Sequence, residues 1–266
     1  MKASEALLAA TRRIDRFDAE LLLAHLVGED RLAMLAGADR ELDFEAFDAL
    51  VTRRAGGEPL AYITGRREFW SLDLAVSPAV LIPRPDSETL VDAALAARRD
   101  RPPATILDLG TGSGALLLAA LSEWPNARGL GVDASPAALA VARGNADRLG
   151  FGRRAAFVQG DWGAGLRERF DVILCNPPYV EAAADLSPEV RREPASALFA
   201  GLDGLDDYQR IVPQLPGLLR GGGVALLEIG HTQAAAVLAL AKAVGLAGIV
   251  RHDLAGRDRC LVLQMV

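Results

Sequence analysis

The sequence predicts an α/β fold in which helices cover both faces of a mostly parallel sheet. Three observations lead to this prediction. From Ala104 onward, apolar runs of strand length alternate with helical patterns, the order that builds parallel sheets. Glycine-rich or polar residues follow several of these runs, where such sheets bind their ligands. With 266 residues, the chain is long enough for this domain and a smaller one.

Composition and charge narrow the class of protein. The chain has a formal net charge of −6, whereas proteins that hold nucleic acid by its phosphates usually carry a basic surface. Its two cysteines, Cys175 and Cys260, favour a reducing compartment over a disulfide framework. The sequence shows no signal-peptide core and no bilayer-spanning apolar run. We expect a cytoplasmic monomer without membrane contact and without direct nucleic-acid contact.

The first 58 residues are predicted to form a small all-α domain. Residues 18–27 have a helical pattern that stops at Gly28, a residue suited to end a helix. Residues 43–55 repeat apolar side chains at spacings of three and four before a Gly-Gly pair. Residues 1–58 therefore read as several short helices packed together.

Residues 59–103 are predicted to connect this domain to the sheet. Leu72, Leu74 and Val76 stand at alternate positions, which predicts the second strand of a short β-hairpin over residues 68–76. A proline-flanked arginine, Arg84, follows, and then a helix over residues 88–99. Two interpretations of Arg84 stay open: it lines a cleft, or it pairs locally with Asp86 or Glu88.

The third segment, residues 104–266, is predicted to form the α/β domain. Strands are expected near residues 104–108, 128–133, 154–159, 171–175 and 223–229, with two more near 247–253 and 259–265. Helices are expected near residues 114–123, 136–149, 206–220 and 232–244. The last two strands are close in sequence, so we expect them to pair antiparallel.

A cofactor site is predicted where the first strand of this domain ends. Its residues are Gly110, Thr111, Gly112, Ser113 and Gly114. Glycines let the backbone approach a ligand closely, and the helix that follows presents free N–H groups. A turn of this kind also suits NAD, so it does not by itself identify the ligand.

Three residues at the ends of the next two strands support a nucleoside ligand. Asp133 ends the second strand, where a carboxylate accepts hydrogen bonds from ribose hydroxyls. Asp161 and Trp162 follow the third strand, where they are placed to take an adenine amino group and to cover its ring. A helix N-cap for Asp161 and core packing for Trp162 are the alternatives.

A candidate acceptor site, Asn176-Pro177-Pro178-Tyr179, follows the apolar run at residues 170–175. The prolines hold the backbone extended, so the carbonyls of Asn176 and Pro177 are available as acceptors. With the Asn176 side-chain oxygen they suit a planar amino group, which has two hydrogens to donate. The Tyr179 ring offers a flat face for a conjugated amide or base. The alternative is an ordinary turn.

Taken in order, residues 108–114, Asp133, Asp161 with Trp162, and residues 176–179 resemble the motifs of class I S-adenosylmethionine methyltransferases. The flanking segments resemble the HemK-type peptide chain release factor glutamine methyltransferases; they are residues 57–63, 68–70, 81–85, 193–194, 197–198, 203–205 and 227–230. Asp86-Ser87 stands where that family more often has Glu-Thr. The resemblance implies a seven-stranded, mostly parallel Rossmann-like sheet with an antiparallel last strand.

The resemblance also implies an activity. S-adenosylmethionine is the cofactor, no metal is needed, and the acceptor is the glutamine of a release factor's Gly-Gly-Gln loop. Asn176, Pro177 and Tyr179 are the expected catalytic residues; with Pro178 they bind the glutamine, and Asn176 also faces the cofactor. Because residues 104–266 hold this whole site, residues 1–58 are expected to recognise the release factor. The alternatives are a nucleic-acid base N-methyltransferase and a cofactor-binding protein without catalysis.

Overall fold

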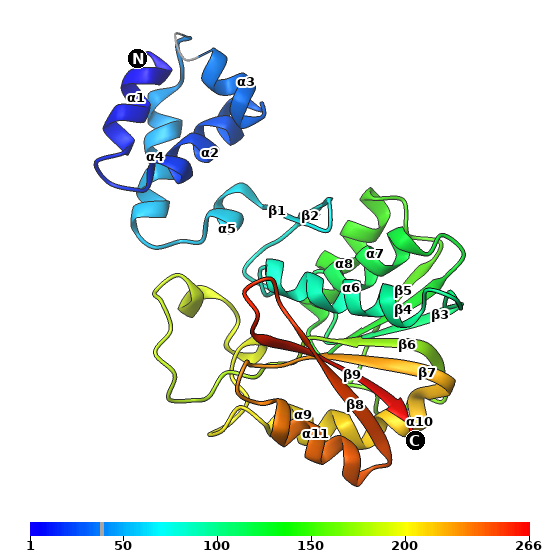
Figure 1. The fold of residues 1–266 in the computed structure, drawn as a ribbon. Helices are drawn as coiled ribbons and strands as arrows, with labels where there is room; N and C mark the ends of the chain where they lie inside the picture. Colours follow the sequence, from blue (N-terminus) through cyan, green and yellow to red (C-terminus); the bar gives the residue numbers. More distant parts are fainter. Residues whose placement is uncertain (38–39) are drawn as a thin grey trace. The chain divides into compact units, whose positions relative to one another are not determined.

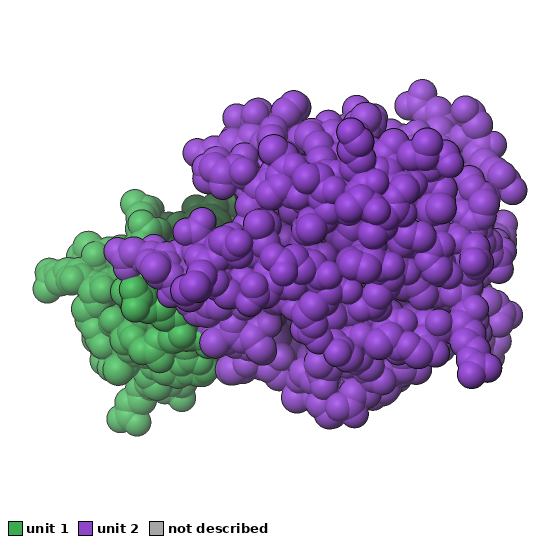
Figure 2. All heavy atoms as spheres, turned by 90° about the horizontal axis from the view of Figure 1, so that it is seen from below, with its two compact units in different colours: residues 1–66, 186–192 green, residues 67–185, 193–266 purple. Residues whose placement is uncertain are grey.

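The computed structural model describes residues 1–37 and 40–266, and the chain forms two compact units. Unit 1 comprises Met1–Arg66 together with Leu186–Arg192. Unit 2 comprises Arg67–Asp185 together with Glu193–Val266. Figure 1 shows the secondary structure of both, and Figure 2 distinguishes their atoms by colour. The division by role into residues 1–58, 59–103 and 104–266 stays a prediction.

Unit 1 is built from short helices around an apolar core. The helices are α1 (Ala3–Ala10), α2 (Arg16–Val27), α3 (Arg31–Ala36), α4 (Phe44–Ala55) and α5 (Leu60–Thr64). An aspartate begins each of three helices by accepting a backbone N–H: Asp15 for α2, Asp30 for α3 and Asp43 for α4. Gly28 ends α2 in the left-handed conformation, as the sequence predicts.

A distant segment completes unit 1. Residues 186–192, which include the short helix η2 (Val190–Arg192), belong to it although they follow strand β6 (Phe170–Cys175) in the chain. Arg54 pairs with both Asp18 and Glu189, and Arg192 donates to the carbonyl of Gly56. The links to Glu189 and to Gly56 join residues more than 130 positions apart, so no local pattern predicts them.

The predicted hairpin is present, with β1 (Arg66–Phe69) pairing with β2 (Leu72–Ala75). Its turn residues, Trp70 and Ser71, both have positive φ, the conformation that a tight two-residue hairpin turn requires. The buried side chain of Asn145 in helix α8 (Pro136–Arg148) bonds the hairpin: Oδ1 accepts from Ala75 N at 2.7 Å and Nδ2 donates to Ala75 O at 2.9 Å. Nδ2 also donates to Ser113 O, so one amide ties the hairpin to the glycine-rich turn.

The seven-stranded sheet of unit 2 has the order β5-β4-β3-β6-β7-β9-β8. Its strands are β3 (Thr105–Leu109), β4 (Arg128–Asp133), β5 (Ala155–Gln159), β6 (Phe170–Cys175), β7 (Leu219–Glu228), β8 (Leu246–His252) and β9 (Asp258–Met265). Strands β3 to β7 pair parallel, whereas β9 runs antiparallel to both β7 and β8. The predicted fold class, including the antiparallel last strand, is confirmed.

Helices cover the two faces of this sheet. Those of unit 2 are η1 (Pro85–Ser87), α6 (Glu88–Ala97), α7 (Ala115–Glu123), α8 (Pro136–Arg148), η3 (Ala195–Ala197), α9 (Asp206–Ile211), η4 (Val212–Gln214), α10 (Leu215–Leu218) and α11 (Ala234–Ala243). The single helix predicted over residues 206–220 is wrong. Pro213 and Pro216 break the segment into short pieces, and β7 already begins at Leu219.

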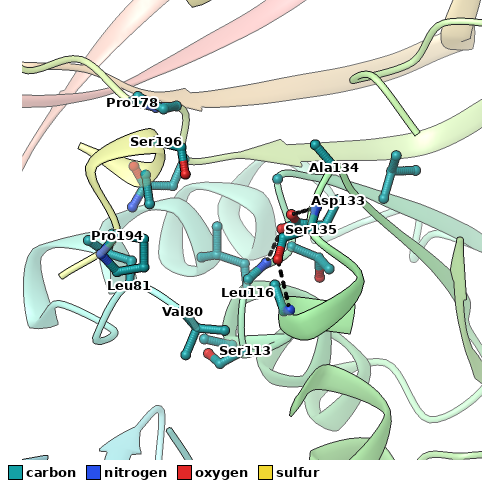
Figure 3. Close-up of a pocket in the computed structure, with 18 of the residues that line it drawn as sticks. Val80, Leu81, Ser113, Leu116, Asp133, Ala134, Ser135, Pro178, Pro194 and Ser196 are labelled. Atoms are coloured by element: carbon teal, nitrogen blue, oxygen red, sulfur yellow. Dashed lines mark hydrogen bonds between the residues drawn. The ribbon is translucent and has the colours of Figure 1, made fainter. Parts of the chain in front are cut away.

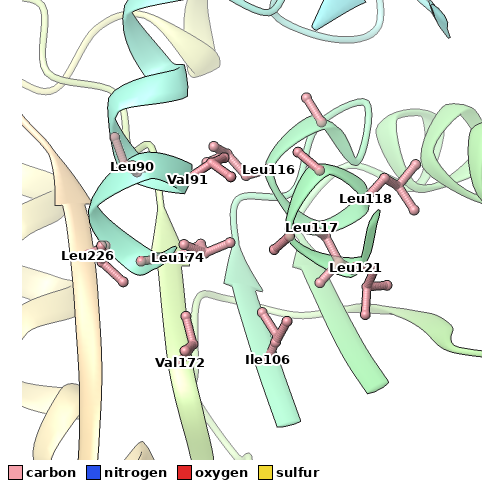
Figure 4. Packing of buried hydrophobic residues seen from close by; sticks show 14 of the residues in the cluster. Leu90, Val91, Ile106, Leu116, Leu117, Leu118, Leu121, Val172, Leu174 and Leu226 are labelled. Carbon is pink, nitrogen blue, oxygen red and sulfur yellow. The ribbon is translucent and has the colours of Figure 1, made fainter. Parts of the chain in front are cut away.

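Two apolar clusters lie on opposite faces of the sheet. In Figure 4, α6 and α7 lie side by side over one face and point leucines at the strands beneath. Labelled members of this cluster are Leu90, Val91, Ile106, Leu116, Leu117, Leu118, Leu121, Val172, Leu174 and Leu226. Each leucine so buried stabilises the fold by roughly 1.5–3 kcal/mol, so the strand ends that carry the site sit on a rigid support. No helix in residues 1–37 and 40–266 is long and apolar enough to cross a membrane.

Candidate active site

The carboxyl ends of β3, β4 and β6 open onto a cavity of about 690 Å³ in unit 2. It lies at the point where the chain order of the sheet reverses, because β3 has β4 on one side and β6 on the other. Open parallel sheets bind their ligands at such points. The lining residues predicted from the sequence are Gly110, Thr111, Gly112, Ser113, Asp133, Asp161, Trp162, Asn176 and Pro178. Gly114, Pro177 and Tyr179 are not part of the lining.

The glycine-rich turn after β3 needs its glycines. Gly110, Gly112 and Gly114 all have positive φ, and Gly114 begins α7. A Cβ at Gly110 would also lie 3.0 Å from the Trp162 ring and 4.0 Å from the carbonyl oxygen of Asn176. The turn after β3 thus lies close to residues that follow β5 and β6, and its glycines leave space that side chains would occupy.

Asp133 at the end of β4 supports this turn. Its Oδ2 accepts from Gly112 N at 2.9 Å and its Oδ1 accepts from Ser135 N at 2.9 Å. Figure 3 shows Asp133 next to Ser135 among the residues that line the cavity, with hydrogen bonds drawn as dashed lines. Each carboxylate oxygen has a further lone pair, so both keep capacity for a ligand hydroxyl. Asp133 therefore shapes the turn as well as facing the predicted ribose position.

Asp161 and Trp162 line the cavity next to β4. Asp161 has an exposed side chain that pairs with Arg210, and no helix starts at it, so the N-cap alternative does not hold. Trp162 adopts a φ of 52°, a strained value for a bulky residue. Asp207 and Arg210 also line the cavity. Sequence reasoning missed them, since they lie in a helix some 45 residues further along the chain.

The Asn176–Tyr179 segment is divided between the cavity and the core. Asn176 is half-buried and donates from Nδ2 to Ser87 Oγ at 3.1 Å, while Pro178 forms part of the wall. Pro177 is buried. The Tyr179 hydroxyl donates to Glu228 Oε1 at 3.2 Å, and its backbone carbonyl accepts from Gln233. The side chains of Asn176 and Tyr179, at the two ends of the predicted acceptor site, are thus held by different partners, Ser87 and Glu228.

Two buried carboxyl groups, Asp108 and Glu228, lie beneath this site and were not among the predicted site residues. Burial raises the pKa of each to about 7. Thr111 Oγ1 donates to Asp108 Oδ2 at 2.6 Å. The other oxygen of each carboxyl group, Asp108 Oδ1 and Glu228 Oε2, is buried without a hydrogen-bond partner among the described residues. A carboxyl group directly after an apolar strand run is the sequence signal that would have found both.

Asp108 makes the stability of the ligand-free protein depend on pH. In the unfolded chain its pKa is about 3.9, whereas burial raises the pKa in the folded protein to about 7. Between these values the folded state binds a proton that the unfolded chain has released, so the free energy of unfolding falls as pH rises towards 7. We expect Asp108→Asn, which mimics the neutral acid, to lose less stability than the wild type between about pH 5 and pH 8.

Urea unfolding of the ligand-free proteins at both pH values measures this difference. Asp92→Asn, an exchange at an exposed position of α6, is the matched control and should follow the wild type. Equal losses in Asp108→Asn and in the wild type would show that Asp108 titrates normally.

The opposite wall of the cavity is held by Arg84 and Glu193. The Glu193 side chain is buried, accepts from Ile82 N at 2.9 Å and pairs with Arg84. Neither interpretation of Arg84 that the sequence left open included Glu193 as its partner. Asp86, one of the local partners considered, lies 3.4 Å from Arg259 instead. The pair holds the segments carrying Pro83 and Pro194, which both line the cavity, against each other.

Comparison with known proteins first gives the class. A family model described as a methyltransferase domain matches residues 101–228. A methyltransferase of known structure from Pyrococcus furiosus has a TM-score of 0.54 at 16% identity, covering 80% of this chain and 95% of that chain. At this identity the likeness shows the fold alone, and the fold is that of the Rossmann-like methyltransferases.

The family follows from closer relatives. A model described as the PrmC N-terminal domain matches residues 1–65. The release factor glutamine methyltransferase of Moorella thermoacetica is 45% identical, covering 98% of this chain and 98% of that protein. The protein of the same name from Rhodospirillum rubrum is 45% identical over 93% of this chain and 78% of its own length. The chain belongs to the family of release factor glutamine methyltransferases, as its motifs predict.

Proposed function

We propose that this protein transfers a methyl group from S-adenosylmethionine to N5, the side-chain amide nitrogen, of the glutamine in the Gly-Gly-Gln motif of peptide chain release factors. The observation that carries the proposal is the placement of Asn176. Its side chain opens onto the same cavity as the glycine-rich turn and Asp133, and its Nδ2 is already held by Ser87. The name of the relatives, release factor glutamine methyltransferase, supports the substrate.

The residues around the turn fit S-adenosylmethionine. We assign Gly110–Gly114 to the methionine part of the cofactor, where backbone N–H groups and the start of α7 face the cavity. Asp133 takes the ribose hydroxyls, and Asp161 and Trp162 take the adenine. The space that a Cβ at Gly110 would fill supports this assignment. When bound, the cofactor supplies an electrophilic methyl group on a positively charged sulfur.

Asn176 and Pro177 are assigned to the acceptor amide. An amide nitrogen is a weak nucleophile because its lone pair is delocalised, so it must be positioned well. Asn176 Oδ1 and the Pro177 carbonyl each accept one of its N–H hydrogens, which aligns the nitrogen with the methyl group and stabilises the positive charge that develops on it. Positioning of this kind can contribute roughly 7–11 kcal/mol. The methylated nitrogen is acidic, and water takes its proton.

Tyr179 and Pro178 complete the acceptor site in this proposal. Pro178 forms the wall beside Asn176. Tyr179, whose hydroxyl is held by Glu228, presents its ring to one face of the glutamine amide. Release factors act on cytoplasmic ribosomes, so the enzyme, which we propose to be a monomer, meets its substrate in the cytoplasm.

Methyl transfer from radiolabelled S-adenosylmethionine tests the proposed function. We expect label in a whole release factor and none in the same factor with its Gly-Gly-Gln glutamine replaced by alanine. DNA and RNA are assayed beside it, because a base amino group offers the same hydrogens. Label in nucleic acid but not in release factor would instead identify a base N-methyltransferase, and no transfer to any acceptor would leave a cofactor-binding protein.

Asp133→Ala is expected to weaken cofactor binding. The carboxylate makes a charge-assisted contact with the ribose that contributes about 1.5–3 kcal/mol, and its loss also frees the N–H groups of Gly112 and Ser135. Isothermal titration calorimetry with S-adenosylmethionine should therefore give a Kd at least about tenfold higher. Asp92→Ala, on the surface of α6, is the control and should bind as the wild type does. Unchanged affinity in Asp133→Ala would remove Asp133 from the cofactor site.

A further inference from the structure

Asn176 has a buried neighbour that sets which end of its amide faces the cavity. Ser87, at the end of η1, is 4% exposed and accepts a hydrogen bond from Asn176 Nδ2 at 3.1 Å. The two atoms come from residues 89 positions apart, so packing alone brings them together. With Nδ2 bonded to Ser87, Oδ1 is the end of the amide that is left for a ligand.

The opposite orientation of this amide would prevent the chemistry. An asparagine amide is similar in shape when turned by 180°, so packing alone distinguishes its two ends weakly. Turned, Asn176 would present an NH₂ group to the NH₂ group of an acceptor amide, and two donors do not bond. A hydrogen-bond acceptor must therefore hold Nδ2 away from the acceptor amide.

A hydroxyl group holds Nδ2 only if its own hydrogen points elsewhere. Serine both donates and accepts, and a Ser87 hydroxyl aimed at Asn176 would favour the turned amide. Glu228, at the end of β7, supplies the second acceptor. It is 1% exposed, and its interaction with the Ser87 hydroxyl lowers the pKa of Glu228 against the larger rise that burial causes.

The surroundings of Glu228 leave one of its carboxylate oxygens able to accept a hydrogen bond from the Ser87 hydroxyl. Oε1 accepts the Tyr179 hydroxyl, whereas Oε2 is buried and has no hydrogen-bond partner among the described residues. A buried carboxylate oxygen without a partner is costly. The Ser87 hydroxyl rotates freely about its Cβ–Oγ bond, so its hydrogen can turn to the carboxylate without moving any heavy atom.

We propose that Ser87 and Glu228 are positioning residues that fix the amide of Asn176 through a directional hydrogen-bond chain, Asn176 Nδ2–H to Ser87 Oγ and Ser87 Oγ–H to the Glu228 carboxylate. The inference deepens the proposed function and rests on it for the identity of the acceptor. In its ionised form the Glu228 carboxylate can only accept, and in that form it sets the direction of the whole chain. Glu228 also holds Tyr179, so one buried group orients both sides of the acceptor site.

Ser87→Ala tests the chain in the full-length enzyme. We expect kcat for methylation of the release factor to fall at least tenfold, while KM for the factor and Kd for S-adenosylmethionine change less than threefold. Ser87→Thr keeps the hydroxyl group and should restore most of kcat. Ser122→Ala, whose hydroxyl bonds Ala119 O within α7, is the matched control for loss of a serine hydroxyl. A wild-type kcat in folded Ser87→Ala would overturn the proposal, as would a kcat in Ser87→Thr as low as in Ser87→Ala.

Glu228→Gln gives a second, independent test, because glutamine can also donate to Ser87 and the direction of the chain is lost. Its kcat should fall at least tenfold at an unfolding temperature close to that of the wild type. A wild-type kcat in Glu228→Gln would mean that the carboxylate sets no direction.

A third measurement needs no acceptor and therefore separates this inference from the proposed function. The side-chain NH₂ of Asn176, assigned by NMR from its absence in Asn176→Ala, should exchange with solvent at least tenfold faster in Ser87→Ala than in the wild type. Slow exchange in the wild type together with no methylation of release factor would leave the chain in place and overturn the proposed substrate. Equal exchange in both proteins would overturn the chain, whatever the enzyme methylates.

Discussion

Asn176→Ala is expected to lower kcat about a hundredfold, the cost of removing one preorganised group at a site of developing charge. The variant loses Oδ1, one of the two acceptors proposed for the glutamine N–H hydrogens, and keeps the Pro177 carbonyl. Cofactor affinity should change much less, because Asp133 and the glycine-rich turn are untouched. Steady-state kinetics with whole release factor and calorimetry with S-adenosylmethionine measure the two effects separately.

Asn176→Asp is the sharper variant of the same test. Aspartate still offers an oxygen to the substrate, but it loses the Nδ2 donor that bonds Ser87 in the wild type. Its negative charge also stabilises the cationic cofactor before the reaction. We expect kcat to fall at least about tenfold, equivalent to 1.4 kcal/mol. Wild-type turnover in Asn176→Asp would show that the amide group is not required.

Loss of the N-terminal helices is expected to produce the second large effect. Every residue assigned to methyl transfer lies in unit 2, and the Gly-Gly-Gln loop itself offers little side-chain surface for recognition. Contacts remote from the reacting nitrogen must then select the right glutamine, and such binding energy also orients it. Deleting residues 1–57 should lower kcat/KM for whole release factor by about two orders of magnitude or more. Cofactor binding and the weak activity on a short Gly-Gly-Gln peptide should change little.

The deletion also removes partners of residues that remain in the chain, so a full-length variant should be tested beside it. Ile63 is buried among the helices that the deletion removes, and Arg192 would lose its bond to Gly56. Phe17 and Leu32 are exposed apolar residues of the helices, at 54% and 74%, and Arg31 lies over the Phe17 ring. Phe17→Ser with Leu32→Ser keeps the core intact and should still lower kcat/KM for whole factor at least about tenfold.

The short peptide serves as the internal control for both variants. It reports the integrity of the site in unit 2, because it reaches only the acceptor residues. A folded deletion variant that methylates whole release factor as well as its parent does would show that the helices are not the docking surface. A loss of activity on the peptide as large as that on the whole factor would point to damage of the site instead.

Local sequence patterns determined most of the architecture. The strand predicted at residues 128–133 has those same bounds in the structure, and that predicted at 171–175 differs by one residue. Residues 172–175 are an apolar run, and residues 129–132 alternate glycine with Leu130 and Val132, so short-range chemistry specifies both strands. The single helix predicted at residues 206–220 is wrong because Pro213 and Pro216 divide the segment. Proline removes a helical hydrogen bond at each of those positions, and tertiary packing starts β7 early.

The residues of the candidate site also form two groups, those that the sequence predicts and those that only the structure shows. The glycines of the turn, Asp133 and the Asn176–Tyr179 segment follow strand ends, and a parallel sheet places all such ends at one edge. The sequence by itself therefore determined which family the chain resembles and most of the strand-end residues that line the cavity, although Gly114, Pro177 and Tyr179 are not part of the lining. It did not show that the side chains of Ser87, Glu228 and Arg210 pair with residues of the site.

Only the tertiary structure decided those pairings. Ser87 bonds Asn176 across 89 positions, Tyr179 bonds Glu228 across 49, and Glu193 holds Ile82 across 111. Propensity and periodicity describe residues within a turn or two of each other, whereas these bonds depend on how η1, β6 and β7 pack. A buried polar group must find a partner wherever the fold brings one within about 3 Å. The orientation of the Asn176 amide, on which the proposed chemistry depends, is therefore a property of the packed molecule rather than of its motif.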